Sequence, residues 1–376
     1  MDKKLSPLPS ICKKYKVDNA FDWYNTARPA ILKLLAENEY GIIPPYPESM
    51  KIELWRERRN LVDGTARRRE FRVTLANGGK RHKFDVLVYS PEKPGKKPLT
   101  AIASLNFKGN AGVALEDDVL PLDAVHNAQP GRWPIKQLVK DNIMLVTAAR
   151  NDFYYDDPTP KSRKNSIFRL FGDVDGSDRH CTALSAWAFG FRTLCDLILT
   201  LPEVDPKRIW LHGHSRLGKT ALWAAANDPR VAGVVSNDSG CGGAAISRDK
   251  EGETLKAIID KFPHWFVPEF DKYKDNEKAL PWDQHFLVSL SAPRPVLVAS
   301  ASEDQWAHPY NEFRAAVAAG EVYRLFGIPG IEEDTPFPAP EAPILRRGVG
   351  YYLRTGKHGV VPYDWKQVTD FIKLNS

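Results

Sequence analysis

A serine flanked by glycines is the residue of this chain best placed to do chemistry. Ser215 lies in RIWLHGHSRLGKTALW (208–223), where a short apolar run is followed by a Gly-x-Ser turn and a helical pattern. Such a turn between strand and helix exposes the serine hydroxyl and aims the first N–H groups of the helix at any oxyanion formed there. Gly213 and Gly218 leave room for the turn, although the second glycine comes one residue later than usual. The alternative is a Gly-Ser loop that only caps a helix. The choice between a nucleophile and a capping loop depends on other residues of the chain.

Two aspartates and a histidine follow later apolar runs of the chain. Asp238 and Asp304 each follow a run typical of a buried strand, and His358 lies in a Gly-containing loop before the last helix. Because ligands bind beyond the carboxyl ends of parallel strands, these side chains are expected beside Ser215. A serine becomes a nucleophile when a neutral imidazole takes its proton and a carboxylate orients that imidazole. The chain order serine, acid, histidine is that of the α/β-hydrolases, which favours a triad over an isolated surface histidine.

The composition is that of a globular protein. The chain has 376 residues, 43% hydrophobic and 27% charged, which favours one α/β domain with insertions over two equal domains. The formal net charge of +6 is spread along the chain, so no nucleic-acid partner is predicted. No apolar stretch approaches the ~18 residues of a membrane span, and the chain as given opens with no secretory signal. Its oligomeric state stays open, as does the choice between an exported and a cytoplasmic location.

The cysteines predict neither a disulfide framework nor a metal site. They are Cys12, Cys181, Cys195 and Cys241, and no CxxC or cysteine/histidine ligand spacing occurs. At least two of them are expected to be core thiols. No metal and no cofactor are therefore predicted.

The chain is predicted to form a helical arm (1–50) and a single α/β-hydrolase catalytic domain (51–376), with a doubly wound, mostly parallel sheet. A lid-like insertion rich in Trp, Pro and Gly is expected at about 240–281. Alternating patterns predict three antiparallel leading strands, and continuous apolar runs predict buried ones. The expected strands are 51–58, 69–76, 82–90, 99–107, 142–149, 209–213, 231–237, 294–300 and 322–327; the expected helices include 132–141, 182–206, the helix that follows Ser215, and 364–374.

Several motifs also carry a family resemblance. GHSRLGKTALW, SNDSGCGGAAISR, FPHWF, LPWDQH, SAPRPVLVASASEDQW and LRTGKHGVVPYDW resemble the glucuronoyl esterases (carbohydrate esterase family 15), from about Glu37 to the C-terminus. The resemblance implies a metal-independent serine triad on an α/β-hydrolase fold. It further implies hydrolysis of esters that join 4-O-methyl-glucuronic acid of glucuronoxylan to lignin alcohols, by a secreted or periplasmic enzyme.

Two residues of the helix after the elbow match the family. Its members carry an arginine directly after the nucleophile and a lysine four residues after it, matched by Arg216 and Lys219. The Arg216 N–H is also an oxyanion donor by geometry, and its side chain can add a charge-assisted bond. A second donor is expected around Phe107 and Lys108. Lys219 lies one turn along the helix, where it can reach sugar hydroxyls.

The resemblance assigns two further sugar contacts and leaves the acid open. Glu253 and Trp306 match sugar-contacting positions, and the indole offers an apolar face to a pyranose, with a core tryptophan as the alternative. Fungal members place a glutamate where this chain has Asp238, whereas many bacterial members carry the acid at the position of Asp304. We favour Asp304 as the partner of His358, and we expect Asp238 to bond the Ser239-Gly240 turn.

The sequence therefore predicts a serine carboxylesterase that acts on glucuronate esters. Another cell-wall esterase, such as an acetylxylan or feruloyl esterase, is the alternative within the class. A carbohydrate-binding pseudoenzyme is the alternative outside it.

Overall fold

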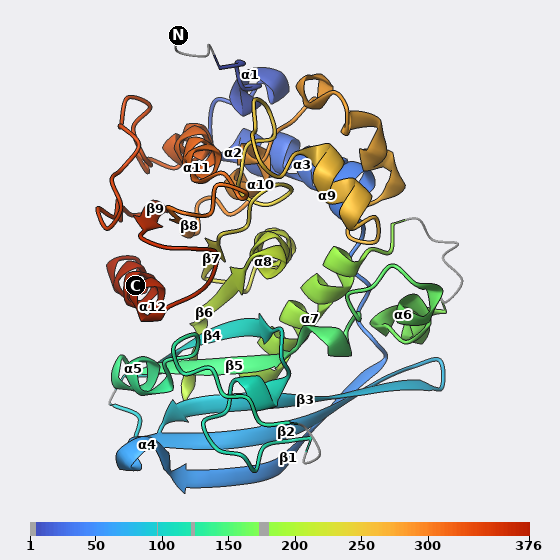
Figure 1. Ribbon diagram of the computed structural model, residues 1–376, viewed down its shortest axis with the longest axis vertical. Helices are drawn as coiled ribbons and strands as arrows, with labels where there is room; N and C mark the ends of the chain where they lie inside the picture. The colour runs from blue at the N-terminus through green and yellow to red at the C-terminus, as the bar shows by residue number, and fades with distance from the viewer. Residues whose placement is uncertain (1–4, 96, 122–124, 173–179) are drawn as a thin grey trace.

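The computed structural model describes residues 5–95, 97–121, 125–172 and 180–376. In these residues one sheet has the strand order β1-β2-β3-β5-β4-β6-β7-β8-β9 (Figure 1). The first three strands pair antiparallel, β3 pairs antiparallel with β5, and every later pairing is parallel. The strands are β1 (Ser49–Asn60), β2 (Ala66–Asn77), β3 (Lys80–Pro91), β4 (Leu99–Asn106), β5 (Ile143–Ala149), β6 (Val204–His214), β7 (Gly233–Asn237), β8 (Val296–Ala301) and β9 (Val349–Arg354). This topology confirms the mostly parallel sheet with antiparallel leading strands.

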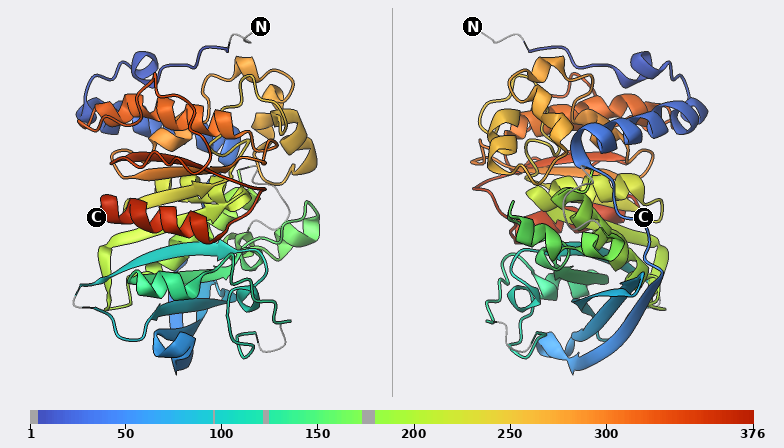
Figure 2. Two further views of the ribbon diagram at one scale, coloured as in Figure 1. Left: turned by 60° about the vertical axis from the view of Figure 1, so that its left-hand side comes forward. Right: turned by 90° about the vertical axis from the view of Figure 1, so that its right-hand side faces the viewer.

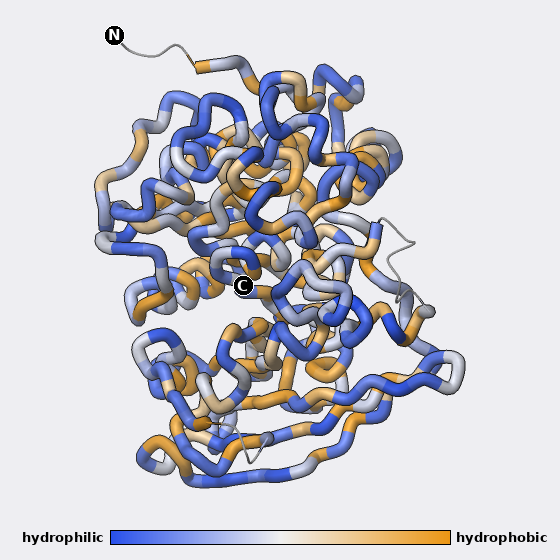
Figure 3. Tube along the Cα trace, turned by 45° about the vertical axis from the view of Figure 1, so that its right-hand side comes forward, coloured by the Kyte–Doolittle hydropathy of each residue, from blue (hydrophilic) through white to orange (hydrophobic). Residues whose placement is uncertain are grey.

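Helices cover both faces of the sheet (Figure 2). The apolar residues of α5 (Ile135–Lys140) and α12 (Pro362–Leu374) join one core cluster, and those of α7 (Ala183–Ile198), α8 (Arg216–Asn227) and α11 (Pro309–Arg324) join the other. Successive residues of a strand point to opposite faces, so each buried strand supplies both clusters. In β4 all the residues are buried, as its continuous apolar run predicted. Hydrophobic segments accordingly gather inside the molecule (Figure 3).

Most of the chain from Ile11 to Tyr40 is helical, and residues 1–4 lie outside the described part. The helical segment contains α1 (Ile11–Tyr15), α2 (Ala20–Asp22), α3 (Arg28–Leu35) and two π-helical turns (Trp23–Ala27 and Ala36–Tyr40). The division into an arm and one catalytic domain stays a prediction.

The region predicted as a lid contains α9 (Leu255–Lys261) and two 3₁₀ turns (Pro268–Tyr273 and Glu277–Ala279), followed by α10 (His285–Ser289). The other short α-helices of the described residues are α4 (Leu61–Gly64) and α6 (Pro160–Lys164), and further 3₁₀ turns lie at Asn110–Gly112, Arg150–Asp152 and Ile167–Phe171. None of the described helices combines the length and the apolar character that crossing a bilayer requires.

The strand predicted at 322–327 is wrong. Val322 to Arg324 form the last turn of α11, and Gly327, with φ +71°, ends the turn that follows. A short apolar run is ambiguous between strand and helix, and here it continues the buried stripe of a helix that starts at Pro309. The last strand is β9, a short run that was not predicted as a strand. A Cβ at Gly350 would lie 2.7 Å from the Phe371 ring.

The long helix predicted in 182–206, with Pro202 and Pro206 as its stop signals, ends before the first of these prolines. It ends at Ile198, and β6 begins at Val204, so the prolines of this segment lie in the turn and the start of the strand. At least two core thiols were expected among the four cysteines, and Cys195 and Cys241 are buried.

Candidate active site

Ser215 lies between β6 and α8 in a strained backbone conformation, with φ 59° and ψ −131°. A positive φ is unfavourable for a side chain with a Cβ, and such residues persist where neighbouring contacts hold them. Here the Ser215 N–H donates to Asn237 O at 2.8 Å. A Cβ at Gly213 would lie 1.9 Å from Leu217 O, and one at Gly218 would lie 3.0 Å from the nearest side-chain carbon. Gly213 is therefore required by close approach within the elbow, whereas a Cβ at Gly218 would need only a small shift of its neighbour.

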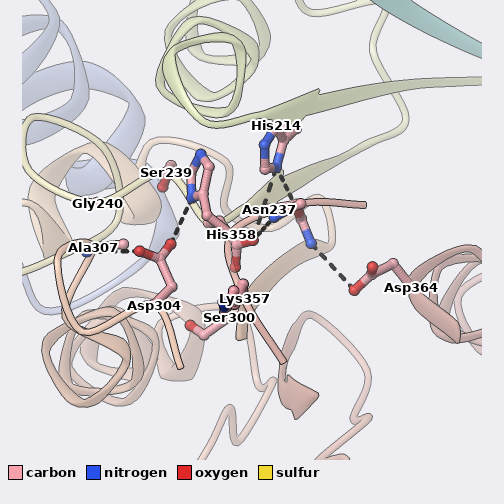
Figure 4. Close-up of polar contacts among 12 residues, drawn as sticks. His214, Asn237, Ser239, Gly240, Ser300, Asp304, Ala307, Lys357, His358 and Asp364 are labelled. Atoms are coloured by element: carbon pink, nitrogen blue, oxygen red, sulfur yellow. Dashed lines mark hydrogen bonds and ion pairs between the residues drawn. The ribbon is translucent and has the colours of Figure 1, made fainter. Parts of the chain in front are cut away.

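His358 and Asp304 form a short hydrogen bond at the carboxyl edge of the sheet. Nδ1 of His358, in the loop after β9, lies 2.6 Å from Oδ2 of Asp304, which follows β8 (Figure 4). An ionised carboxylate accepts, so Nδ1 carries the proton and Nε2 is left as the acceptor. The His358 ring lies 4.5 Å, centroid to centroid, from that of His214, the residue before Ser215. The structure thus brings His358 and Asp304 to the elbow.

Asp238 contacts the loop that carries His358 rather than the imidazole. Its Oδ2 accepts from Gly359 N at 3.1 Å and lies 3.6 Å from Nη2 of Arg354. Burial raises the pKa of this carboxyl well above its usual range. The expected bonds to the Ser239-Gly240 turn are made instead by Glu312, whose Oε1 accepts from Gly240 N at 2.9 Å.

Three side chains at this edge have the spacing of metal ligands. One atom each of Asp238, Asp304 and His358 lie within 4.8 Å of one another. However, Nδ1 of His358 is already bonded to Asp304, and Asp238 accepts a backbone N–H. This arrangement is that of a hydrogen-bonded imidazole between two carboxylates.

The guanidinium of Arg216 is fixed by Asp156, a carboxylate that no sequence motif singles out. Its Nη1 pairs with Asp156, and its Cζ lies over the rings of Trp265 at 4.6 Å and Phe262 at 5.2 Å. Asp156 follows β5 in YYDDP, a loop with no motif that distinguishes it from a surface turn.

The loop after β4 also reaches the elbow. The Phe107 ring lies 6.1 Å from that of His214 in an edge-to-face arrangement. The guanidinium groups of Arg132 and Arg150 each lie 5.2 Å from the Phe107 centroid. The segment predicted to supply a second oxyanion donor is therefore adjacent to the residue before Ser215.

The residues assigned to the sugar lie on the α8 side of the elbow. Lys219 is buried, and its Nζ donates to the carbonyls of Ser239 and Cys241, the latter at 2.6 Å. The same nitrogen lies 4.0 Å from Oε2 of Glu253. Burial lowers the pKa of Lys219. Glu253 N donates to Trp306 O at 3.0 Å, and Trp306 is 52% exposed, so the core alternative for this tryptophan is wrong.

Known proteins match this chain over most of its length. A family model described as glucuronyl esterase, fungi, matches residues 73–327. A carbohydrate esterase of an unknown prokaryotic organism is 33% identical over 95% of this chain and 86% of its own. The 4-O-methyl-glucuronoyl methylesterase of Schizophyllum commune is 28% identical over 83% of this chain and 71% of its own.

Two solved structures share the whole architecture. A glucuronoyl esterase from Solibacter usitatus superposes with a TM-score of 0.90 at 33% identity and covers 99% of both chains. A promiscuous CE15 esterase from a marine bacterial metagenome gives a TM-score of 0.86 at 32% identity, over 100% of this chain and 98% of its own. The predicted α/β-hydrolase fold is thereby confirmed.

Proposed function

This chain belongs to the glucuronoyl esterase family, and we propose that it hydrolyses esters of glucuronic acid through an acyl-enzyme on Ser215. The observation that carries the proposal is the 2.6 Å bond between His358 and Asp304 beside a strained serine elbow. A relative that is 33% identical over 95% of this chain also supports it.

In the proposed mechanism His358 Nε2 takes the proton of Ser215 as its oxygen attacks the ester carbonyl. Asp304 holds the imidazole in the required tautomer and stabilises the imidazolium. The N–H of Arg216 and one from the loop after β4 bond the oxyanion, and the Arg216 side chain adds charge. The tetrahedral intermediate expels the alcohol, which receives the proton from His358. Water, activated by the same imidazole, then releases the uronic acid and restores Ser215.

The substrate side of the proposal rests on the family. Lys219, Glu253 and Trp306 are proposed to contact the glucuronate. The natural substrate is proposed to be the ester between 4-O-methyl-glucuronic acid of glucuronoxylan and a lignin alcohol. Because that polymer lies outside the cell, we also propose an exported location.

The test compares hydrolysis of a benzyl ester of glucuronic acid with that of an aryl acetate. We expect a clear preference for the uronate ester in kcat/KM. Ser215→Ala should lower the rate by at least ~10³, because no other nucleophile is proposed. A chelator should leave the rate unchanged. A preference for acetyl esters would identify a deacetylase instead, and absence of Ser215-dependent turnover would favour a carbohydrate-binding pseudoenzyme.

A further inference from the structure

One buried carboxylate, that of Asp156, is shared by four polar side chains from separate parts of the chain. Its Oδ2 pairs with Nη1 of Arg216 at the start of α8 and with Nη1 of Arg150, at the end of β5, at 2.7 Å. Its Oδ1 lies 2.8 Å from Nε2 of His264 and 2.7 Å from Nε1 of Trp265, both in the predicted lid. The carboxylate side chain is 5% exposed. It therefore joins the elbow, the segment that follows β5 and the insertion at one point.

The electrostatics of this cluster require the charge on Asp156. Burial alone would raise the pKa of Asp156, but the hydrogen bond from His264 and the charges of Arg216 and Arg150 outweigh it. The pKa is held well below its usual range. The two guanidinium groups repel each other, and the charge of Arg216 contributes to a lowered pKa of Arg150, whose main cause is burial. Removing the carboxylate would leave two neighbouring cations without their common partner.

The ion pair with Asp156 uses only one of the nitrogen atoms of the Arg216 guanidinium. Its Nη1 is bound to Asp156, and the guanidinium packs over the Trp265 ring. Nη2 has no hydrogen-bond partner within the described ranges, and 25% of the side chain is exposed. An arginine held in this way keeps N–H donors for a ligand. Its rotamers are already restricted, so it loses less conformational entropy when the ligand binds.

We propose that Asp156 is the positioning residue for Arg216 and fixes its guanidinium beside Ser215 before the substrate binds. The positive charge is then preorganised for the oxyanion of the tetrahedral intermediate, and reorganisation during the reaction is avoided. Through His264 and Trp265, the same carboxylate holds the insertion against the elbow. The inference rests on the proposed function, because it assigns Arg216 to the oxyanion formed on Ser215.

The test is a double-mutant cycle between Asp156→Asn and Arg216→Ala, read on the benzyl glucuronate ester and on the aryl acetate. Asparagine keeps an oxygen acceptor and removes the charge. We expect Asp156→Asn to lower kcat ~10- to 100-fold on both esters with little change in KM, because the oxyanion is common to both. In the Arg216→Ala background the same substitution should lower kcat no further.

A matched control separates positioning from general stability. The side chain of Asp228 is also 5% exposed, and its Oδ2 lies 2.6 Å from Nη2 of Arg230. This ion pair lies beyond the C-terminal end of α8, away from the elbow. Asp228→Asn should retain kcat. Additive losses in the cycle, or an equal loss of kcat in Asp228→Asn, would overturn the proposal. If Asp156→Asn does not fold, Asp156→Glu, which keeps the charge but displaces it, takes its place and must again be non-additive with Arg216→Ala.

The outcome is distinguishable from failure of the proposed function. A wild-type enzyme without preference for the uronate ester would refute the substrate assignment, yet the cycle could still be read on the aryl acetate. Full activity of Ser215→Ala would refute the nucleophile and, with it, the oxyanion that Arg216 is proposed to stabilise.

Discussion

At the scale of single residues, two carboxylates flank His358 but contact different groups. Asp304 bonds the ring nitrogen at 2.6 Å, whereas Asp238 accepts the backbone N–H of Gly359 at 3.1 Å. Only a carboxylate bonded to the ring can select the tautomer. The chain order of these residues was predictable from the sequence. The partner of Asp238 was not, because it depends on how the loop after β9 folds back over β7.

The first prediction separates the two acids. Asp304→Asn should lower kcat by ~10²–10⁴, because an amide facing Nδ1 favours the wrong tautomer. Asp238→Asn should lower kcat clearly less, because it weakens only the support of the Gly359 backbone. Steady-state kinetics of both variants on one activated ester measure the difference. The assignment of Asp304 fails if Asp238→Asn causes the larger loss, and comparable losses would mean that the acids share the task.

The second prediction concerns the uronate. Glu253→Ala should raise KM for glucuronate esters by a factor equivalent to about 1–3 kcal/mol of lost polar contact. KM for an aryl acetate should change little. Lys219→Ala should do the same but should also lower the melting temperature, since its Nζ bonds the carbonyls of Ser239 and Cys241. Equal damage to both substrates in the Glu253 variant would show that this residue supports the fold instead of the sugar.

At the scale of elements, the elbow depends on two glycines to different degrees. The third prediction is that Gly213→Ala lowers the free energy of unfolding by more than ~3 kcal/mol, because its Cβ would lie 1.9 Å from a backbone carbonyl that cannot move without opening α8. Gly218→Ala should cost about 1 kcal/mol, since its Cβ would meet a side-chain carbon at 3.0 Å. Chemical denaturation measures both. If the two variants were equally destabilised, the close approach of Gly213 to the Leu217 carbonyl would not limit the side chain at position 213.

Sequence patterns were sufficient to predict some of the strands but not all of them. Continuous apolar runs identified β4, β5 and β8, because a strand that is buried on both faces has apolar side chains at successive positions. The run at 322–327 was misassigned and β9 was missed for one common reason. Short apolar segments carry little periodicity, so packing decides between helix and strand: Tyr323 is buried on α11, while Gly350 admits Phe371 against the sheet.

At the scale of the whole molecule, the unpredicted features are contacts between distant segments. Asp156 meets Arg216 and Trp265 across some sixty and a hundred residues of chain, and no local spacing signals such a meeting. Glu39 is a second example. It joins the N-terminal helices to the segment before α10, accepting from Trp282 Nε1 and Gln284 Nε2, each at 2.8 Å.

Burial raises the pKa of Glu39 to about 7 from an ordinary 4.5, although its hydrogen bonds to Gln284 and Trp282 oppose the shift. Between these two values the folded protein retains a proton that the unfolded chain has released. The contribution of Glu39 to stability is therefore complete below pH 4.5, is lost as the pH rises to about 7, and is constant above it.

The fourth prediction follows from that linkage and isolates this one group. Glu39→Gln cannot titrate, so the difference in unfolding free energy, wild type minus variant, should fall by about 3 kcal/mol between pH 4.5 and 7. Denaturant unfolding at a series of pH values measures it. Glu37→Gln, at a more exposed carboxyl two residues earlier on the same helical turn, should leave the shape of the curve unchanged. Parallel curves for wild type and Glu39→Gln would mean that Glu39 is ionised in the folded protein. Its bonds to Trp282 and Gln284 would then be strong enough to offset the whole cost of burying a charge where the N-terminal helices meet the rest of the molecule.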